Sequence, residues 1–249
     1  MLKDDWFIFK NIDRLSEQLA NDILNIAKNS IKSNDNFKIV LAGGESVLGL
    51  YKILSNSKSD WSKWHVFMGD ERCLPLEDKD RNDNIINKVW LNSSPIPKEN
   101  INFMNAELGA DNAALHYEGV IKSIGDFDIV LLSIGEDGHT ASLFPDHLYD
   151  ENKSVVVECN SPKYPKDRVS MSYSRLNQSK NVFKVVNGSS KQDAIDLWLK
   201  GETLPINKVN GYFEKIYICE NVFRVRHSLS CSCKCQPSER RQKNVVLSP

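Results

Sequence analysis

The sequence FDIVLLSIGEDGHTASLFP, residues 127–145, indicates both how the chain folds and where its chemistry lies. Its first eight residues, 127–134, are mostly apolar and β-branched, which is typical of a strand buried on both faces of a sheet. The run stops at Gly135, and a polar Glu-Asp-Gly-His turn follows. Parallel α/β sheets bind their ligands just beyond the carboxyl ends of their strands. This stretch therefore predicts a buried strand that leads into a ligand site, with His139 as the first candidate for chemistry.

The chain on both sides of this stretch alternates between strand-like and helix-like segments. Apolar residues at helical spacing predict an amphipathic first helix over 12–31. Strands are predicted at 37–41, 64–68, 101–104, 127–134, 168–173, 182–186 and 215–220, and further helices at 46–54, 81–91, 109–124 and 191–200. Such alternation indicates βαβ units. We expect an α/β fold with a Rossmann-like, mainly parallel sheet flanked by helices.

The overall composition is that of an ordinary globular protein. The 249 residues are 41% hydrophobic and 26% charged, and the net charge of -1 argues against a strongly basic surface for nucleic acid. No apolar run approaches the roughly 18–20 residues that a membrane-spanning helix needs, and the first residues do not resemble a secretory signal. We expect a cytoplasmic protein with a small-molecule ligand, no nucleic-acid partner and no membrane association. Whether it is a monomer or a dimer stays open.

Residues 224–249 differ from the rest of the chain. They contain six basic residues and one acidic residue, together with Cys231, Cys233 and Cys235 in a C-x-C-x-C pattern. No fourth Cys or His stands at zinc-finger spacing. We expect a single α/β domain over 1–223, followed by a basic, Cys-containing tail that is disordered or artefactual and holds no metal.

Polar residues follow three of the predicted strands. They are Gly43, Gly44 and Ser46, then Asp70, Glu71 and Arg72, and finally Glu136, Asp137, Gly138 and His139. Arg168, which opens a later strand, and Lys191, which opens a helix, are basic residues that could face the same crevice. Glycines at a strand-to-helix turn allow backbone N–H groups to approach phosphate oxygens, and Arg and Lys add charge-assisted hydrogen bonds. These residues together suggest a site for a small anion with a carbonyl group nearby.

His139 is the candidate general base of this site. A neutral imidazole near pH 7 is suited to removing a proton from water, and Asp137, two residues earlier, could orient the ring. The position of His139 after a buried strand, in a turn flanked by glycines, favours a functional role over a packing role. His65 and His116 lie within a predicted strand and a predicted helix, where packing or exposure accounts for them.

With these residues in view, the chain resembles the 6-phosphogluconolactonase family, whose relatives include glucosamine-6-phosphate isomerase/deaminase. The resemblance runs over residues 5–223. Its most specific element is GEDGHTASLFP at 135–145, which resembles the lactonase signature throughout its length. Supporting elements, in the same order along the chain, are GDERCLP at 69–75, Arg81-Asn82, RVSMS at 168–172, and Gly188 with Lys191.

The resemblance implies hydrolysis of 6-phosphoglucono-1,5-lactone to 6-phosphogluconate, a step of the oxidative pentose phosphate pathway. It implies that His139 takes a proton from the water that attacks C1 and then returns it to the ring oxygen. Arg72 would stabilise the developing negative charge, and Asp70 would shape the site. The residues implied to hold the phosphate are Gly43, Gly44, Ser46, Arg168 and Lys191. No metal and no organic cofactor are implied.

Two other functions are compatible with the same scaffold. The deaminases continue after Asp-Gly-His with an apolar pair and an Asn-Glu-Pro sequence whose Glu assists proton transfer, whereas residues 140–145 contain no carboxylate, which favours the lactonase. A sugar-phosphate sensor would bind without turnover, but such regulators usually carry a DNA-binding domain, for which the residues before 12 leave no room. The glycine loop departs from the usual Gly-Gly-Ser-Thr-Pro, because Glu45 and Val47 replace its Ser and Pro. An anionic side chain beside a phosphate is unfavourable unless it turns away.

Overall fold

The computed structural model describes residues 5–223, so the predicted tail over 224–249 lies outside the described residues. The main sheet has the strand order β1-β10-β9-β6-β2-β3-β5, and every neighbouring pair in it is parallel. This confirms the predicted mainly parallel α/β sheet. Its strands are β1 (Trp6–Phe9), β2 (Phe37–Leu41), β3 (Trp64–Met68), β5 (Ile101–Asn102), β6 (Phe127–Ser133), β9 (Ser179–Val186) and β10 (Phe213–Cys219).

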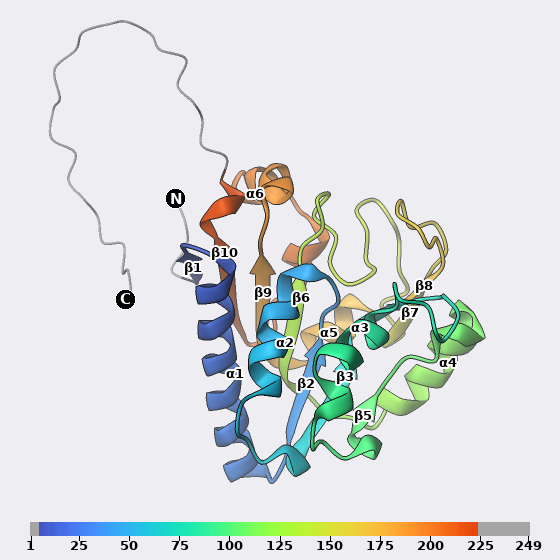
Figure 1. The fold of residues 1–249 in the computed structure, drawn as a ribbon. Coiled ribbons are helices and arrows are strands. Elements are labelled where there is room, and N and C mark those ends of the chain that lie inside the picture. Colours follow the sequence, from blue (N-terminus) through green and yellow to red (C-terminus); the bar gives the residue numbers. More distant parts are fainter. Residues whose placement is uncertain (1–4, 224–249) are drawn as a thin grey trace, which may run out of the picture.

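Helices flank this sheet, as the alternating pattern predicts. In Figure 1, α1 (Ile12–Asn34), α2 (Leu48–Ser55) and α3 (Asn82–Val89) lie in front of the sheet, and each packs against the next. The other helices are α4 (Ala110–Ile121), α5 (Tyr173–Asn177) and α6 (Gln192–Leu199). Within residues 5–223, no helix is both long enough and apolar enough to cross a membrane.

A second, smaller sheet is antiparallel and was not part of the predicted architecture. It contains β4 (Asp70–Arg72), β8 (Arg168–Met171) and β7 (Val155–Glu158), in that order across the sheet. The predicted strand at 168–173 therefore belongs to this sheet, and residues 70–72, predicted as a polar turn, form one of its strands. The cause is long-range pairing: Asp70 lies opposite Ser170, one hundred positions later in the numbering, and Arg72 lies opposite Arg168. Local sequence patterns carry no signal for such pairing.

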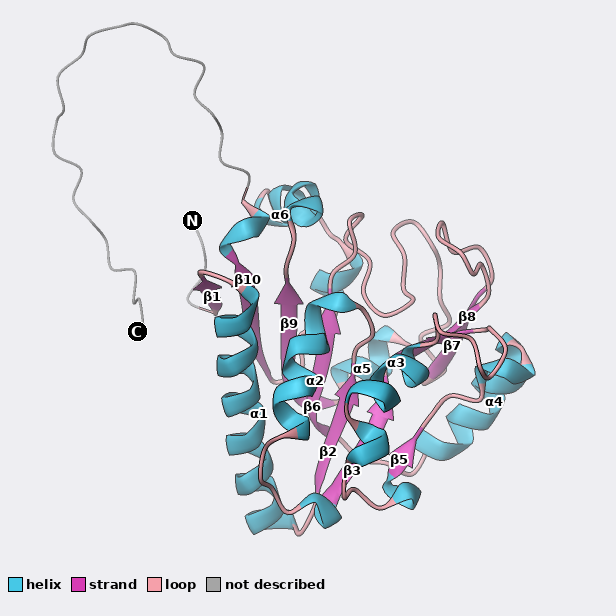
Figure 2. Cartoon of the chain, viewed as in Figure 1, coloured by secondary structure: helices cyan, strands magenta, loops and turns pink. Residues whose placement is uncertain are grey.

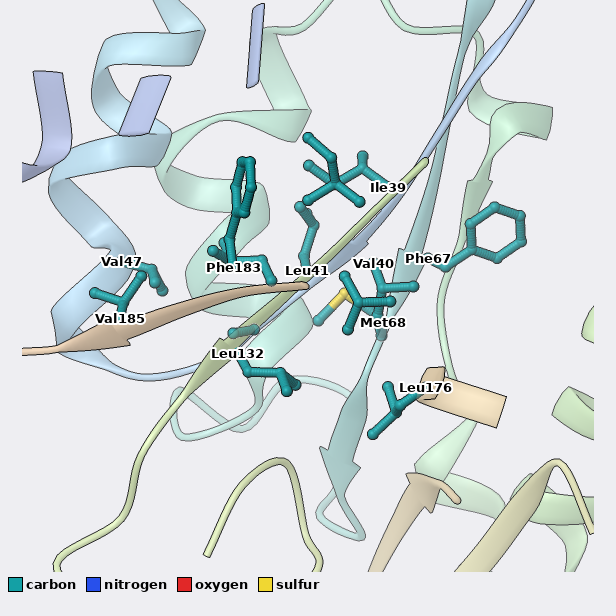
Figure 3. Packing of buried hydrophobic residues seen from close by; sticks show 14 of the residues in the cluster. Ile39, Val40, Leu41, Val47, Phe67, Met68, Leu132, Leu176, Phe183 and Val185 are labelled. Carbon is teal, nitrogen blue, oxygen red and sulfur yellow. The ribbon is translucent and has the colours of Figure 1, made fainter. Parts of the chain in front are cut away.

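The core explains why the central strands read as continuous apolar runs. Successive side chains of a strand point to opposite faces, and both faces of this parallel sheet are covered. In Figure 3, Ile39 and Leu41 project to one side of β2 and Val40 to the other. All three side chains are fully buried. β6 is buried from Phe127 to Leu132 in the same way.

The order of the strands places a topological switch point between β2 and β6. These two strands are neighbours, but the chain continues from β2 to β3 on one side and from β6 to β9 on the other. The arrowheads of β2, β6 and β9 in Figure 2 point to the same end of the sheet. Loops that leave adjacent parallel strands in opposite directions open a crevice at their carboxyl ends, where α/β proteins bind ligands.

Candidate functional site

The loops that follow β2 and β6 meet at this crevice. Ser133, the last residue of β6, donates a hydrogen bond from Oγ to the carbonyl oxygen of Gly43 at 3.3 Å. The carbonyl oxygen of Ser133 accepts a hydrogen bond from Oγ1 of Thr140 at 3.0 Å. The glycine loop and the histidine turn, predicted from separate parts of the sequence, are therefore adjacent.

The histidine turn is closed by its own backbone. The N–H of Gly135 donates to the carbonyl oxygen of His139 at 2.7 Å, and the N–H of Gly138 donates to that of Gly135 at 3.2 Å. Gly138 has a φ of +86°, a left-handed conformation that glycine adopts without steric cost. A bridge between Thr140 and Leu143 ends the turn. The chain reverses within a few residues, which returns His139 to the end of β6.

His139 and Asp137 form a hydrogen-bonded pair. Oδ1 of Asp137 lies 2.5 Å from Nδ1 of His139 and also accepts the backbone N–H of His139 at 3.1 Å. Burial alone would raise the pKa of Asp137, but the hydrogen bonds and charge of His139 lower it to about 2. An ionised Asp137 keeps the ring proton on Nδ1, which leaves the lone pair of Nε2 able to accept a proton. The His139 side chain is 16% exposed, so water can reach it.

The buried ring of Phe144 lies between His139 and Arg168. Its centroid is 4.5 Å from that of the His139 ring and 5.6 Å from Cζ of Arg168. The backbone N–H of Phe144 donates to the hydroxyl of Tyr149 at 2.9 Å, and this hydroxyl donates to Glu158 at 2.6 Å. Phe144 is thereby fixed, and it holds the candidate base near a buried guanidinium. The signature contains Phe144, but sequence alone did not assign it this packing role.

Asp70 is a buried carboxylate that connects three segments. Its Oδ2 accepts a hydrogen bond from Oγ of Ser142 at 2.6 Å, and its backbone carbonyl accepts one from Nδ2 of Asn82 at 3.2 Å. Asn82 in turn packs so closely on Gly43 that a Cβ at position 43 would lie 2.1 Å from Oδ1 of Asn82. That oxygen is buried and has no partner within the described residues. Asn82 and Ser142 both lie in quoted motifs, but only the structure shows that they contact Asp70.

Glu71 is buried beneath the site and holds the first turn of α3. Oε1 accepts the backbone N–H groups of Arg72 and Asn82, and Oε2 accepts that of Asp83, each at 2.8 Å. Burial, followed by the nearby charge of Asp83, raises the pKa of Glu71 to about 8. The three N–H donors fix Asn82 at the crevice. Although acidic side chains gather here, no group of three or more His, Cys, Asp or Glu side chains in residues 5–223 could hold a metal ion.

Arg72 and Arg168 lie opposite each other in the small sheet. Nη1 of Arg72 donates to the carbonyl oxygen of Asp80 at 2.5 Å, whereas its Nε is buried without a partner in the described part of the chain. Burial lowers the pKa of Arg168, and the like charge of Arg72 lowers it further, against the opposing effect of Asp70. The charges of the two guanidinium groups act on each other, and each group can donate charge-assisted hydrogen bonds to an anion.

The side chain of Arg168 is occupied mainly by the loop that precedes it. Nε donates to the carbonyl oxygen of Pro165 at 3.1 Å, and Nη2 donates to those of Lys163 at 3.1 Å and Tyr164 at 3.4 Å. Arg168 is 5% exposed. Within residues 5–223, these bonds leave Nη1 as the nitrogen that an incoming anion can approach. The sequence predicted a cation here and did not predict that it anchors a loop.

Lys191 lies near enough to the histidine turn for the charges of the turn to act on it. It ends the short turn Ser189–Lys191 before α6 and is half-buried. Burial lowers its pKa, and the charges of Glu136, Lys163 and Asp137 act on it as well. Lys163 links the surroundings of the two predicted phosphate ligands: its carbonyl oxygen accepts a hydrogen bond from Arg168, and its charge acts on Lys191.

The glycine loop contacts Ser133 through the carbonyl oxygen of Gly43. Gly44 has a φ of +94°, which suits glycine, and the turn Glu45–Val47 that follows packs against β9. Ser46 is half-buried, whereas Glu45 is exposed. The structure thus joins Gly43 directly to the site and connects Ser46 to it through β9, the strand that precedes Lys191.

Comparison with known proteins identifies the family of the chain. Residues 10–217 match the family model described as glucosamine-6-phosphate isomerases/6-phosphogluconolactonase. The chain is 32% identical over 229 residues to 6-phosphogluconolactonase 3, chloroplastic, of Arabidopsis thaliana, which covers 84% of this chain and 70% of that relative. It is 31% identical over 238 residues to 6-phosphogluconolactonase 3 of Saccharomyces cerevisiae, covering 87% of this chain and 95% of that relative.

A solved structure agrees with both sequence matches. The crystal structure of 6-phosphogluconolactonase from Thermotoga maritima superposes with a TM-score of 0.79 at 29% identity, covering 86% of this chain and 99% of that one. Fold, signature turn and sequence similarity therefore extend over the same residues. The chain belongs to the glucosamine-6-phosphate isomerase/6-phosphogluconolactonase family.

Proposed function

We propose that the chain hydrolyses 6-phospho-D-glucono-1,5-lactone to 6-phospho-D-gluconate, in the oxidative pentose phosphate pathway. The observation that carries this proposal is the His139–Asp137 pair at the crevice, with Nε2 of His139 able to accept a proton and guanidinium groups close by. The relatives named above as 6-phosphogluconolactonases support it.

In the proposed reaction, His139 acts first as a base and then as an acid. Nε2 takes a proton from a water molecule while the water oxygen forms a bond to C1 of the lactone. The carbonyl oxygen becomes negatively charged, and Arg72 stabilises it. When the bond between C1 and the ring oxygen breaks, the proton on Nε2 moves to that oxygen, which leaves a carboxylic acid and a hydroxyl group. Asp137 holds the ring in the required tautomer and stabilises the imidazolium that forms transiently.

The remaining residues bind and position the substrate in this proposal. Lys191 and Nη1 of Arg168 contact the phosphate, together with the backbone N–H groups of Gly43 and Gly44 and the hydroxyl of Ser46. Asp70 acts indirectly, since its carboxylate is bonded to Ser142. Glu45 is exposed, so solvent screens the repulsion between its charge and the phosphate.

One feature of the site favours the lactonase over the deaminase. The aromatic ring beside His139 is that of Phe144, and the segment from Thr140 to Pro145 contains no carboxylate. By resemblance, the deaminases place a proton-transferring Glu in this segment. Lactone hydrolysis needs one base that becomes an acid, and His139 meets that need.

The proposal is tested by incubating the purified chain with freshly generated lactone and measuring acid release in a pH-stat, with spontaneous hydrolysis subtracted. We expect enzyme-dependent release of one proton per lactone. Ammonia release from glucosamine 6-phosphate, with no lactone hydrolysis, would establish the deaminase instead. Calorimetric binding of 6-phosphogluconate without any turnover would establish a sensor.

Gly135→Ala is expected to lower kcat by about tenfold or more, with a smaller change in KM. A Cβ at position 135 would lie 2.0 Å from Nδ1 of His139, so the ring must move out of its bond with Asp137. A displacement of this size at a reacting group is costly for catalysis. Steady-state kinetics on the lactone checks this expectation.

Gly119→Ala is the matched control for that variant. Gly119 lies in α4, and a Cβ there would meet nothing within 4 Å, so this change is expected to leave kcat unaltered and to stabilise the helix by about 0.5–1 kcal/mol. Equal kcat in the Gly135→Ala variant and the wild type would show that the His139 ring position does not matter for turnover.

A further inference from the structure

An exposed ion pair joins the histidine turn to the loop between β7 and β8. Nζ of Lys163 lies 3.2 Å from Oε2 of Glu136, and the two side chains are 53% and 51% exposed. Lys163 belongs to the loop between β7 and β8, whereas Glu136 belongs to the histidine turn and directly precedes Asp137. The pair therefore joins two segments that reach the site from different sheets.

The backbone of Lys163 is held firmly. Its carbonyl oxygen accepts hydrogen bonds from Nη2 of Arg168 at 3.1 Å and from Oγ of Ser161 at 2.8 Å, and its N–H donates to the same Oγ at 3.3 Å. Arg168 and Ser161 are buried. Although the ammonium group is exposed, its point of attachment is fixed relative to the histidine turn.

The carboxylate of Glu136 is acted on by two cationic side chains, Lys163 and Lys191. A hydrogen bond from Lys163 lowers the pKa of Glu136 most, followed by the charge of Lys163, the hydroxyl of Ser190 and the charge of Lys191. The same carboxylate attracts Lys191, whose pKa the like charge of Lys163 lowers. Lys163 thus bonds this carboxylate directly, and the charge of Lys191 acts on it as well.

This arrangement suits exchange of one anion for another. A phosphate monoester carries nearly two negative charges and three acceptor oxygens, and it makes stronger charge-assisted hydrogen bonds than a single carboxylate. Exposed ion pairs contribute little to stability, so breaking the bond between Glu136 and Lys163 costs little. Phosphate can therefore replace the carboxylate as the partner of Lys163.

We infer that Lys163 is a further phosphate-binding residue and that Glu136 is its partner until the phosphate group of the substrate displaces it. The inference deepens the proposed function and rests on it. Lys163 contributes binding energy to the phosphate, and Glu136 competes with the phosphate for Lys163 and Lys191.

Three single variants of the full chain test the inference: Lys163→Gln, Glu136→Gln and, as a matched control, Lys166→Gln. Lys166 is exposed on the same loop. Loss of one charge-assisted bond is expected to raise KM for the lactone and Kd for 6-phosphogluconate about tenfold in Lys163→Gln, with a smaller change in kcat. Glu136→Gln is expected to lower Kd for inorganic phosphate about threefold, by removing the competing carboxylate. Lys166→Gln should match the wild type in KM for the lactone and in Kd for both 6-phosphogluconate and inorganic phosphate.

Two results would overturn the inference. A Lys163→Gln variant with KM and Kd within twofold of the wild type would show that Lys163 does not bind phosphate. An increase of Kd for inorganic phosphate in Glu136→Gln would show that Glu136 supports phosphate binding and does not compete with it. Failure of the proposed function is a separate result: the wild type would then not hydrolyse the lactone, while calorimetry with inorganic phosphate and 6-phosphogluconate would still compare the variants.

Discussion

Replacement of His139 by alanine is expected to lower kcat for the lactone by about 10²–10⁴, the range typical of a lost general acid–base group. In the proposed mechanism, His139 alone accepts a proton from water and then donates it to the ring oxygen. The variant lacks this group. Asp137 is not placed to take over, because its Oδ1 lies against Nδ1 of His139, on the other side of the imidazole ring from Nε2, where the mechanism places the water. KM should change far less, since the residues proposed to hold the phosphate are untouched.

The measurement is a pH-stat progress curve on fresh lactone, corrected for spontaneous opening. His116→Ala is the control, because His116 is exposed on α4 and the proposed mechanism gives it no role. Circular dichroism and thermal melting check that both variants fold, which matters for His139→Ala because this side chain is 16% exposed and packs against the ring of Phe144. A His139→Ala variant that retains more than a tenth of the wild-type kcat would remove His139 from the role of base.

The sequence predicted those parts of the site whose chemistry is local. The apolar run before Gly135 predicted β6, and the polar turn after it predicted the position of His139, because a parallel sheet orders its strand ends. Asp137 lies two residues from His139, so their hydrogen bond depends on one turn of the chain. The first helix and the central strands were predicted to within a few residues for the same reason: their apolar periodicity is a short-range signal.

Short elements and long-range pairings could not be predicted in this way. β1 and β7 have four residues each and α5 has five, which is too few for a periodic pattern. The small antiparallel sheet depends on contacts between segments distant in sequence, and so does the bond between Ser142 and Asp70. Residue type indicates what a side chain can bind, whereas the partner depends on which segments the fold brings together.

Arg168 illustrates this limit and leads to a second strong expectation. Its charge suggested phosphate binding, yet two of its three nitrogens hold the carbonyl oxygens of residues 163–165. We expect Arg168→Lys to destabilise the protein by about 2–4 kcal/mol, because a lysine cannot reproduce a planar fork that bonds three carbonyl groups. At about 2–4 °C per kcal/mol for a protein of this size, the melting temperature should fall by about 5–15 °C.

Measuring KM together with the melting temperature of Arg168→Lys shows whether Arg168 holds the loop in place or only binds the phosphate. If Arg168 holds the loop, KM should rise together with the loss of stability, because Lys163 and its ammonium group move when the carbonyl oxygens are released. Arg14→Lys is the control, since Arg14 makes an exposed ion pair with Glu17 on α1 and its replacement should change neither quantity. A raised KM with an unchanged melting temperature would instead assign Arg168 to the phosphate alone. If KM rises and the melting temperature falls together, the buried guanidinium of Arg168 keeps the loop in place, and the phosphate-binding geometry of the site depends on that loop.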